Sequence, residues 1–110
     1  MTADELAAAL ATDFANPGAL KSGEYLAELV LDRIRHVLPE SRGAVVELMQ
    51  SWLASRSEPR TMLAVTVAST FGLDELRGEL LRLLQDIQAG RSFPGFYADP
   101  VESAIGELSP

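Results

Sequence analysis

The chain has 110 residues, which is the usual length of one domain. Hydrophobic residues make up 47% of it and charged residues 23%, a composition typical of globular proteins that argues against disorder. The sequence holds no cysteine, which excludes disulfides, thiolate metal sites and a cysteine nucleophile. No apolar run reaches the ~18 residues of a membrane helix. The acidic start, Met1–Glu5, lacks the basic region of a secretory signal, so we expect a cytoplasmic protein without membrane contact.

The charge of the chain is acidic and unevenly distributed. Sixteen acids and nine bases give a net charge of −7, which on average repels a phosphate backbone, so no nucleic-acid partner is expected. Residues 1–32 carry −5, residues 33–60 carry +2, and the last twelve residues carry −3. Solvated helix faces explain this pattern, and the alternative is a polarised docking surface.

Hydrophobic spacing predicts helices along the first half of the chain. The first covers residues 3–11 and opens with Thr2 and Glu5 at the spacing of a capping box. After a break at residues 16–18, the spacing predicts a second helix over 23–37 and a third over 39–55. Pro39 separates these two, because proline ends one helix and suits the first turn of the next.

The second half begins with an ambiguous segment, residues 59–71. It is rich in β-branched residues, which favours a buried strand, yet its apolar positions run almost all the way round. Pro59 before it and Gly72 after it are typical of helix ends, so we interpret it as a buried helix. A helix over 73–88 follows, then an aromatic loop. Asp99 and Glu102 predict a second capping box for a last helix ending near residue 108.

An internal repeat is the strongest signal in the sequence. Residues 38–59 align without gaps with residues 73–94 at an offset of 35, and ten of the 22 positions are identical. Ordinary composition predicts about two identities by chance. A 35-residue unit of two helices has the dimensions of a helical-hairpin solenoid, in which stacked neighbours bury each other's apolar faces. Gly43 and Gly78 align in this repeat, and we expect them to allow close approach of an adjacent helix.

The repeat resembles the HEAT family of helical repeats. Residues 57–72 look like the second helix of a HEAT unit, with an acidic residue and a proline before a basic residue and an apolar run that ends in glycine. Residues 73–86 look like the first helix of the next unit. The family's usual aspartate and valine in the turn are replaced here by Glu58 and Pro59, and the third unit is truncated. The resemblance implies an α-solenoid fragment that binds a partner, without implying a reaction.

The sequence contains no recognisable catalytic or cofactor-binding motif. The single histidine, His36, has no companion at metal-binding spacing, and no GxSxG, GxGxxG or phosphate-loop motif is present. Carboxylate pairs such as Glu24 and Glu28 lie one helical turn apart on a polar helix face, where water solvates them. A catalytic pair of carboxylates would instead flank a cleft. We therefore expect neither catalysis, nor a cofactor, nor a bound metal.

Three groups of residues are candidates for partner binding. The first is the acidic helix face of Glu24, Glu28 and Asp32, and the second is the face of Glu79, Arg82 and Asp86. The third is the aromatic loop with Phe93, Phe96 and Tyr97. Its rings either fold back to cap the last hairpin or form an exposed anchor for a partner.

These observations predict a single all-α domain of five or six helices. About two stacked hairpins, residues 23–93, lie between an N-terminal capping helix and loop, residues 1–22, and an aromatic loop with a short helix, residues 94–110. The expected function is a noncatalytic protein-interaction module that binds a basic partner through acidic helices. The alternatives are an immunity or antitoxin-like inhibitor of a basic toxin or nuclease, a small ligand-binding or enzyme-like pocket protein, and a homodimer.

Overall fold

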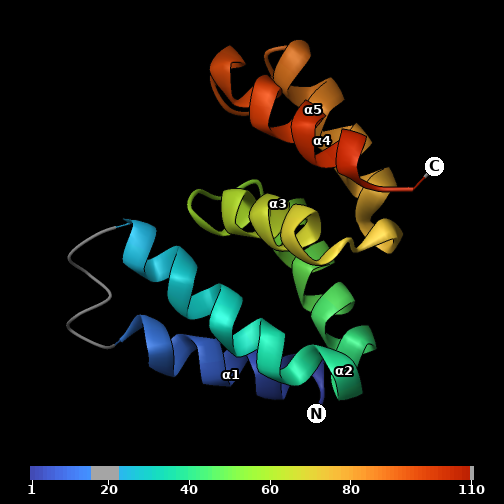
Figure 1. Ribbon diagram of the computed structural model, residues 1–110. Helices are drawn as coiled ribbons and strands as arrows, with labels where there is room; N and C mark the ends of the chain where they lie inside the picture. Colours follow the sequence, from blue (N-terminus) through green and yellow to red (C-terminus); the bar gives the residue numbers. More distant parts are fainter. Residues whose placement is uncertain (16–22, 110) are drawn as a thin grey trace. The chain divides into compact units, whose positions relative to one another are not determined.

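The regular structure of the described residues is entirely helical (Figure 1). The computed structural model describes residues 1–15 and 23–109; the side chains of Phe14 and of residues 23–26 lie outside what it describes. The elements are α1 (Ala3–Phe14), α2 (Gly23–Ser55), α3 (Arg60–Phe71), a 3₁₀ turn η2 (Asp74–Leu76), α4 (Arg77–Gln88), a 3₁₀ turn η3 (Gly95–Tyr97) and α5 (Ala98–Glu107). No strand occurs within these ranges, so the all-α prediction is confirmed, including the helix expected over 59–71.

The chain folds into two compact units, of which the first is Met1–Leu48. Its helix α1 opens with the predicted capping box: Thr2 Oγ1 accepts from the Glu5 N–H at 3.1 Å, and Glu5 Oε1 accepts from the Thr2 N–H at 3.2 Å. Figure 1 shows α1 alongside the first part of α2, in the opposite direction. Arg33 of α2 donates to both carboxylate oxygens of Asp13 in α1, at 3.0 and 3.1 Å. This bidentate pair fastens the two helices together.

The expected break between two helices near Pro39 is present, as a kink two residues later at Ser41. The helix runs from Gly23 to Ser55, and only Ser41 departs from helical geometry, with φ −133° and ψ 36°. Proline lacks an N–H, and its ring clashes with the carbonyl four residues earlier, so it distorts the ladder nearby. Regular helix resumes after Ser41, so α2 consists of two helices joined across this kink, with the break at Ser41 rather than at Pro39.

The second unit, Met49–Pro110, contains the end of α2 and helices α3 to α5. Helix α5 packs against both α3 and α4. Helix α3 buries residues on most of its circumference, namely Thr61, Leu63, Ala64, Val65, Val67 and Ala68. It ends at Gly72, whose left-handed φ of 62° and ψ of 46° suit glycine. The burial explains why the sequence of this segment is apolar all round.

Two expectations about the helices are wrong. Helix α5 begins at Ala98, directly after η3, and its N-cap residue Tyr97 makes no capping hydrogen bond through its side chain. Asp99 therefore lies inside the first turn instead of capping it. A Cβ atom added at Gly43 or Gly78 would meet nothing within 4 Å, so neither glycine is required by a close helix approach.

Candidate functional site

The loop from α4 to α5 presents three aromatic rings, of Phe93, Phe96 and Tyr97, which we call the aromatic corner. Phe93 adopts a left-handed φ of 58°, a conformation uncommon for a residue with a Cβ, and this turns the chain after α4. Pro94 is extended, and the 3₁₀ turn η3 follows, closed by a hydrogen bond of 3.1 Å from the Tyr97 N–H to the Pro94 carbonyl. The backbone of the loop is therefore tightly turned.

The rings of the aromatic corner differ in exposure. Phe96 is 72% exposed and is stacked on Tyr97, with ring centroids 4.6 Å apart and planes at 30°. Phe93 lies on Tyr97 in a tilted arrangement, with centroids 5.4 Å apart, and both of these rings are half-buried. The corner thus combines the two arrangements considered from the sequence: Phe93 and Tyr97 are partly covered, and Phe96 faces solvent.

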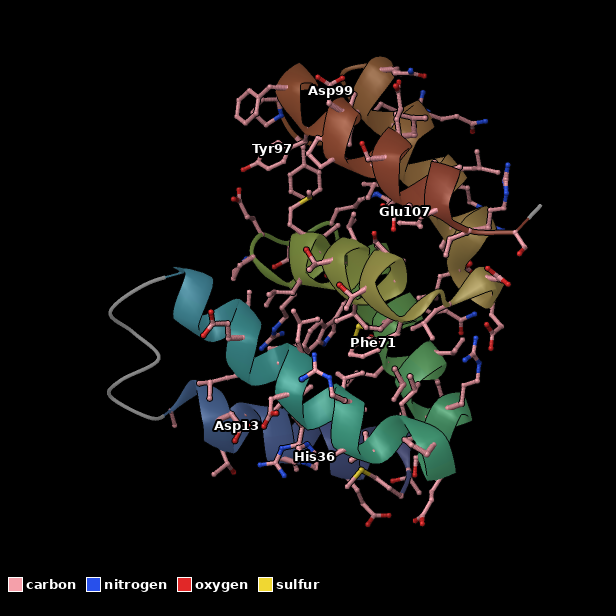
Figure 2. The ribbon with its side chains drawn as sticks, in the orientation of Figure 1. Asp13, His36, Phe71, Tyr97, Asp99 and Glu107 are labelled. Atoms are coloured by element: carbon pink, nitrogen blue, oxygen red, sulfur yellow. The ribbon has the colours of Figure 1, made fainter. Side chains whose placement is uncertain are left out.

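Tyr97 is anchored to the turn that precedes α3. Its hydroxyl donates a hydrogen bond of 2.6 Å to Glu58 Oε1. Because the carboxylate accepts this proton, it favours the protonated phenol and raises the pKa of Tyr97 above its usual value. Figure 2 shows Tyr97 and Asp99 near one end of α5 and Glu107 near the other. The hydrogen bond therefore joins the aromatic corner to the start of α3.

A second set of contacts, the ion pairs of Arg56 and Arg91 with Asp86 of α4, holds the same loop; we call it the Asp86 tie. Arg56, just after α2, donates from Nε and Nη2 to Asp86 Oδ2 at 3.1 and 2.8 Å. Arg91, just after α4, donates from Nε to Asp86 Oδ1 at 3.0 Å, with Nη2 of the same residue at 2.9 Å. The hydrogen bonds from Arg56 and then from Arg91 lower the pKa of Asp86.

The predicted face of Glu79, Arg82 and Asp86 is consequently not an acidic patch. All three residues line one hollow of about 270 Å³, together with Leu53, Ala54 and Arg56. Two guanidinium groups compensate Asp86, and Glu79 accepts a long hydrogen bond of 3.5 Å from Gln50. The structure brings these side chains together as a mixed-charge seam between the end of α2 and α4.

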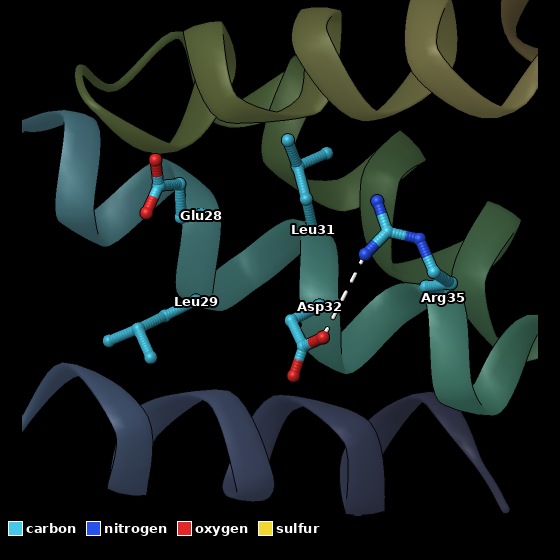
Figure 3. A pocket seen from close by; sticks show the side chains of 5 residues that line it. All are labelled: Glu28, Leu29, Leu31, Asp32 and Arg35. Atoms are coloured by element: carbon cyan, nitrogen blue, oxygen red, sulfur yellow. Dashed lines mark ion pairs between the residues drawn. The ribbon is translucent and has the colours of Figure 1, made fainter.

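The acidic face of α2 lies in the first unit. Glu28 and Asp32 line a hollow of about 380 Å³ with Leu29, Leu31 and Arg35, all projecting from α2 (Figure 3). Asp32 Oδ1 lies 3.8 Å from His36 Nδ1 and 3.8 Å from Arg35 Nη1, and the Arg35 guanidinium offsets part of its charge. Glu24, the third predicted residue, has its side chain outside the described residues. The His36 side chain is 72% exposed, and its Nδ1 lies 2.8 Å from the Asp32 carbonyl oxygen.

Sequence reasoning missed the residues that hold the aromatic corner in place, namely Glu58, Arg56 and Arg91. The alignment of the repeat did contain one signal, because Arg56 and Arg91 are an identical pair in it. The hydrogen bond from Tyr97 to Glu58 joins residues 39 positions apart, and no local pattern indicates it.

No protein-family model, curated protein or solved structure matches this chain. Among the helices of the described ranges, none combines the length and the apolar character needed to cross a bilayer. Residues 1–15 and 23–109 also hold no group of three or more His, Cys, Asp or Glu side chains that could bind a metal ion.

Proposed function

We propose that this protein is a noncatalytic protein-interaction module that contacts its partner through the aromatic corner. The observation that carries the proposal is the 72% exposure of Phe96. It exceeds that of Met1 (53%) and Leu81 (39%), the other large hydrophobic residues exposed in the described part of the chain. Aromatic residues are enriched at the centres of protein interfaces, where burying one ring contributes strongly to affinity.

The aromatic corner is held in place before any partner binds. Phe96 stacks on Tyr97, and Tyr97 is hydrogen-bonded to Glu58. The preceding loop is fixed by Arg91 on Asp86. A contact residue that is already ordered loses less conformational freedom on association, which favours binding.

The charges near the corner favour a basic partner. Arg91, the cation just before the corner, is paired with Asp86, and from residue 92 to residue 110 the chain carries Asp99, Glu102 and Glu107 and no Lys, Arg or His. All three acids are exposed. Complementary charge at an interface accelerates encounter and rejects acidic competitors. We therefore expect the partner to have an apolar recess that receives Phe96, with cationic groups around the recess.

The HEAT-like repeat is part of the same proposal, and the direction of the helices supports it. Tyr97 contacts Glu58 at the start of α3, and Glu107 at the end of α5 accepts from Ser69 near the end of α3, so α3 and α5 run parallel. In a solenoid, equivalent helices of successive repeats stack in parallel. The end of α2 and α4 do the same, since Gln50 contacts Glu79 and Arg56 contacts Asp86.

The experiment that tests the proposal is quantitative affinity capture from the source cells with three forms of the tagged chain. We expect wild type and Leu81→Ala to recover the same basic protein in equal amounts. Phe96→Ala should recover at least about tenfold less, the loss typical of an aromatic hot spot. Leu81 is the matched control, because it is an exposed apolar residue elsewhere in the same unit. Equal recovery with Phe96→Ala would contradict the proposal.

A further inference from the structure

A groove runs between α3 and α5, next to the aromatic corner. The two helices pack side by side and enclose a hollow of about 220 Å³. The hollow, which we call the α3/α5 groove, is lined by Met62, Val65, Thr66, Ser69, Thr70, Pro100, Ser103 and Ala104. Its surface mixes apolar atoms with hydroxyl groups. Such a surface suits the side chains of a docked segment.

Each end of the α3/α5 groove carries a carboxylate. At the beginning of both helices, Glu58 accepts the hydrogen bond of the Tyr97 hydroxyl at 2.6 Å. At the far end, Glu107 accepts from the Ser69 hydroxyl at 3.1 Å. The α3 backbone from residue 60 to residue 69 separates these ends by about 14 Å at 1.5 Å per residue. A partner helix along the groove would need cationic side chains two to three turns apart to reach both.

The charges of the two helices select the occupant. Helix α5 carries Asp99, Glu102 and Glu107 and no cation, and α3 carries one cation, Arg60, at its start. A second copy of this chain brings a net charge of −7 to this acidic rim, which opposes self-association. A cationic segment has the complementary charge.

We propose that the α3/α5 groove binds a basic amphipathic helix of the partner protein. Apolar side chains of that helix pack against Met62 and Pro100, and its Lys or Arg residues pair with the carboxylates of Glu58 and Glu107. Phe96, which precedes α5 in the chain, contacts the same partner next to the groove. This inference rests on the proposed function, since it names the element of the partner that binds next to the aromatic corner.

The test uses the full chain and two synthetic probes of about 14 residues. The first peptide has leucines on one helical face and lysines near both ends, and the second replaces each lysine by glutamate. Titration into ¹⁵N-labelled protein should shift the amide signals of Thr66, Ser69 and Ser103, with the lysine peptide binding at least about tenfold more tightly. The inference would be overturned if both peptides bound equally well, or if the signals of Thr66, Ser69 and Ser103 did not shift while others did.

Variants of the rim and of the groove make the test specific. Ser103→Arg adds bulk and positive charge at an exposed residue that lines the groove. It should lower the affinity of the lysine peptide at least about tenfold. Glu58→Gln and Glu107→Gln should each weaken it by about three- to fivefold. Glu47→Gln, an exposed acid in the first unit, is the matched control and should change nothing. Thr66→Arg repeats the test if Ser103→Arg does not fold, and unchanged affinity in the folded variant would overturn the inference.

Two further outcomes separate this inference from its alternatives. If the groove signals shift on dilution of the protein alone and sedimentation shows a dimer, a second copy is the occupant and the inference is wrong. If Phe96→Ala abolishes capture of the partner while Ser103→Arg does not, the proposed function holds and the groove inference fails. If Phe96→Ala leaves capture intact, the proposed function itself fails.

Discussion

Arg56 and Arg91 stand 35 residues apart and donate hydrogen bonds to the same carboxylate, that of Asp86. They are equivalent positions of the sequence repeat, but the position equivalent to Asp86 is Ser51, so the shared carboxylate exists in one half only. The result is an asymmetric tie between the end of α2 and the loop after α4. That loop leads directly into the aromatic corner.

The Asp86 tie predicts a pH-dependent contribution to stability. The two arginines hold the pKa of Asp86 below its usual value, so the carboxylate is more acidic in the folded than in the unfolded chain. Its contribution is therefore present above the unfolded pKa of about 3.9 and is lost as the pH falls through the folded pKa. Urea unfolding of wild type and Asp86→Asn should differ at pH 7 and converge below about pH 4.

Asp99→Asn is the control for that experiment, because Asp99 is exposed and near the start of α5. A difference between wild type and Asp86→Asn that widens as the pH falls would show that the assigned cause is wrong.

Gly78 in the first turn of α4 predicts a stabilising substitution. A Cβ at this position meets nothing within 4 Å, and the residue is helical. Replacing glycine by alanine in a helix reduces the freedom of the unfolded chain, so Gly78→Ala should raise the free energy of unfolding by about 0.5–1 kcal/mol. Gly72→Ala should instead lower it by about 1 kcal/mol, because Gly72 has a φ of 62°. Chemical denaturation measures the unfolding free energy of both variants. Destabilisation by Gly78→Ala would contradict the placement of Gly78 at an open helical position.

Thr61 predicts a large effect from a small change. It is fully buried, donates to the Trp52 carbonyl at 2.8 Å and accepts from the Ser57 N–H at 3.0 Å. Thr61→Val keeps the shape but removes the hydroxyl partner of two backbone groups, which should cost about 1–3 kcal/mol of unfolding free energy. Thr66→Val, at an exposed position of the same helix, should cost less than about 0.5 kcal/mol. Equal effects in thermal or urea unfolding would contradict the assigned role of Thr61.

Adjacent leucines of α4 provide a test of its orientation. Leu80 is fully buried, whereas Leu81 is 39% exposed. Leu80→Ala leaves a cavity and should cost about 2–5 kcal/mol. Leu81→Ala removes a partly solvated side chain, so we expect a cost within about 0.5 kcal/mol. The reverse order of the two midpoints in urea would mean that α4 presents a different face to its neighbours.

The helices were predictable where a periodic pattern is sufficient. The spacing of Leu76, Leu80, Leu83, Leu84 and Ile87 predicted one apolar helix face, and all of them are buried except Leu84, which is half-buried. The positions of helix ends were less predictable: the break within α2 lies at Ser41, two residues after Pro39, and α5 begins at Ala98 after a 3₁₀ turn instead of at an Asp99 cap. The residue at which a helix begins or breaks depends on contacts that a periodic pattern does not contain.

The candidate site was predictable only in its residue types. The sequence singled out Phe93, Phe96 and Tyr97, but the exposure of each ring depends on contacts with distant residues. Tyr97 is held by Glu58, 39 positions earlier, and the loop is fixed by Arg91 on Asp86. Pairings of this kind arise from the fold and leave no periodic trace.

Site-specific photo-crosslinking in the source cells tests the central claim most directly. A photoreactive phenylalanine analogue is placed at position 96, at position 81 in the same unit, or at position 47 in the first unit. The account predicts one abundant crosslinked product from position 96, containing a basic protein, with little product from the other two positions. No crosslinked protein from position 96, or equal yields from all three positions, would contradict the claim that the aromatic corner is the partner contact.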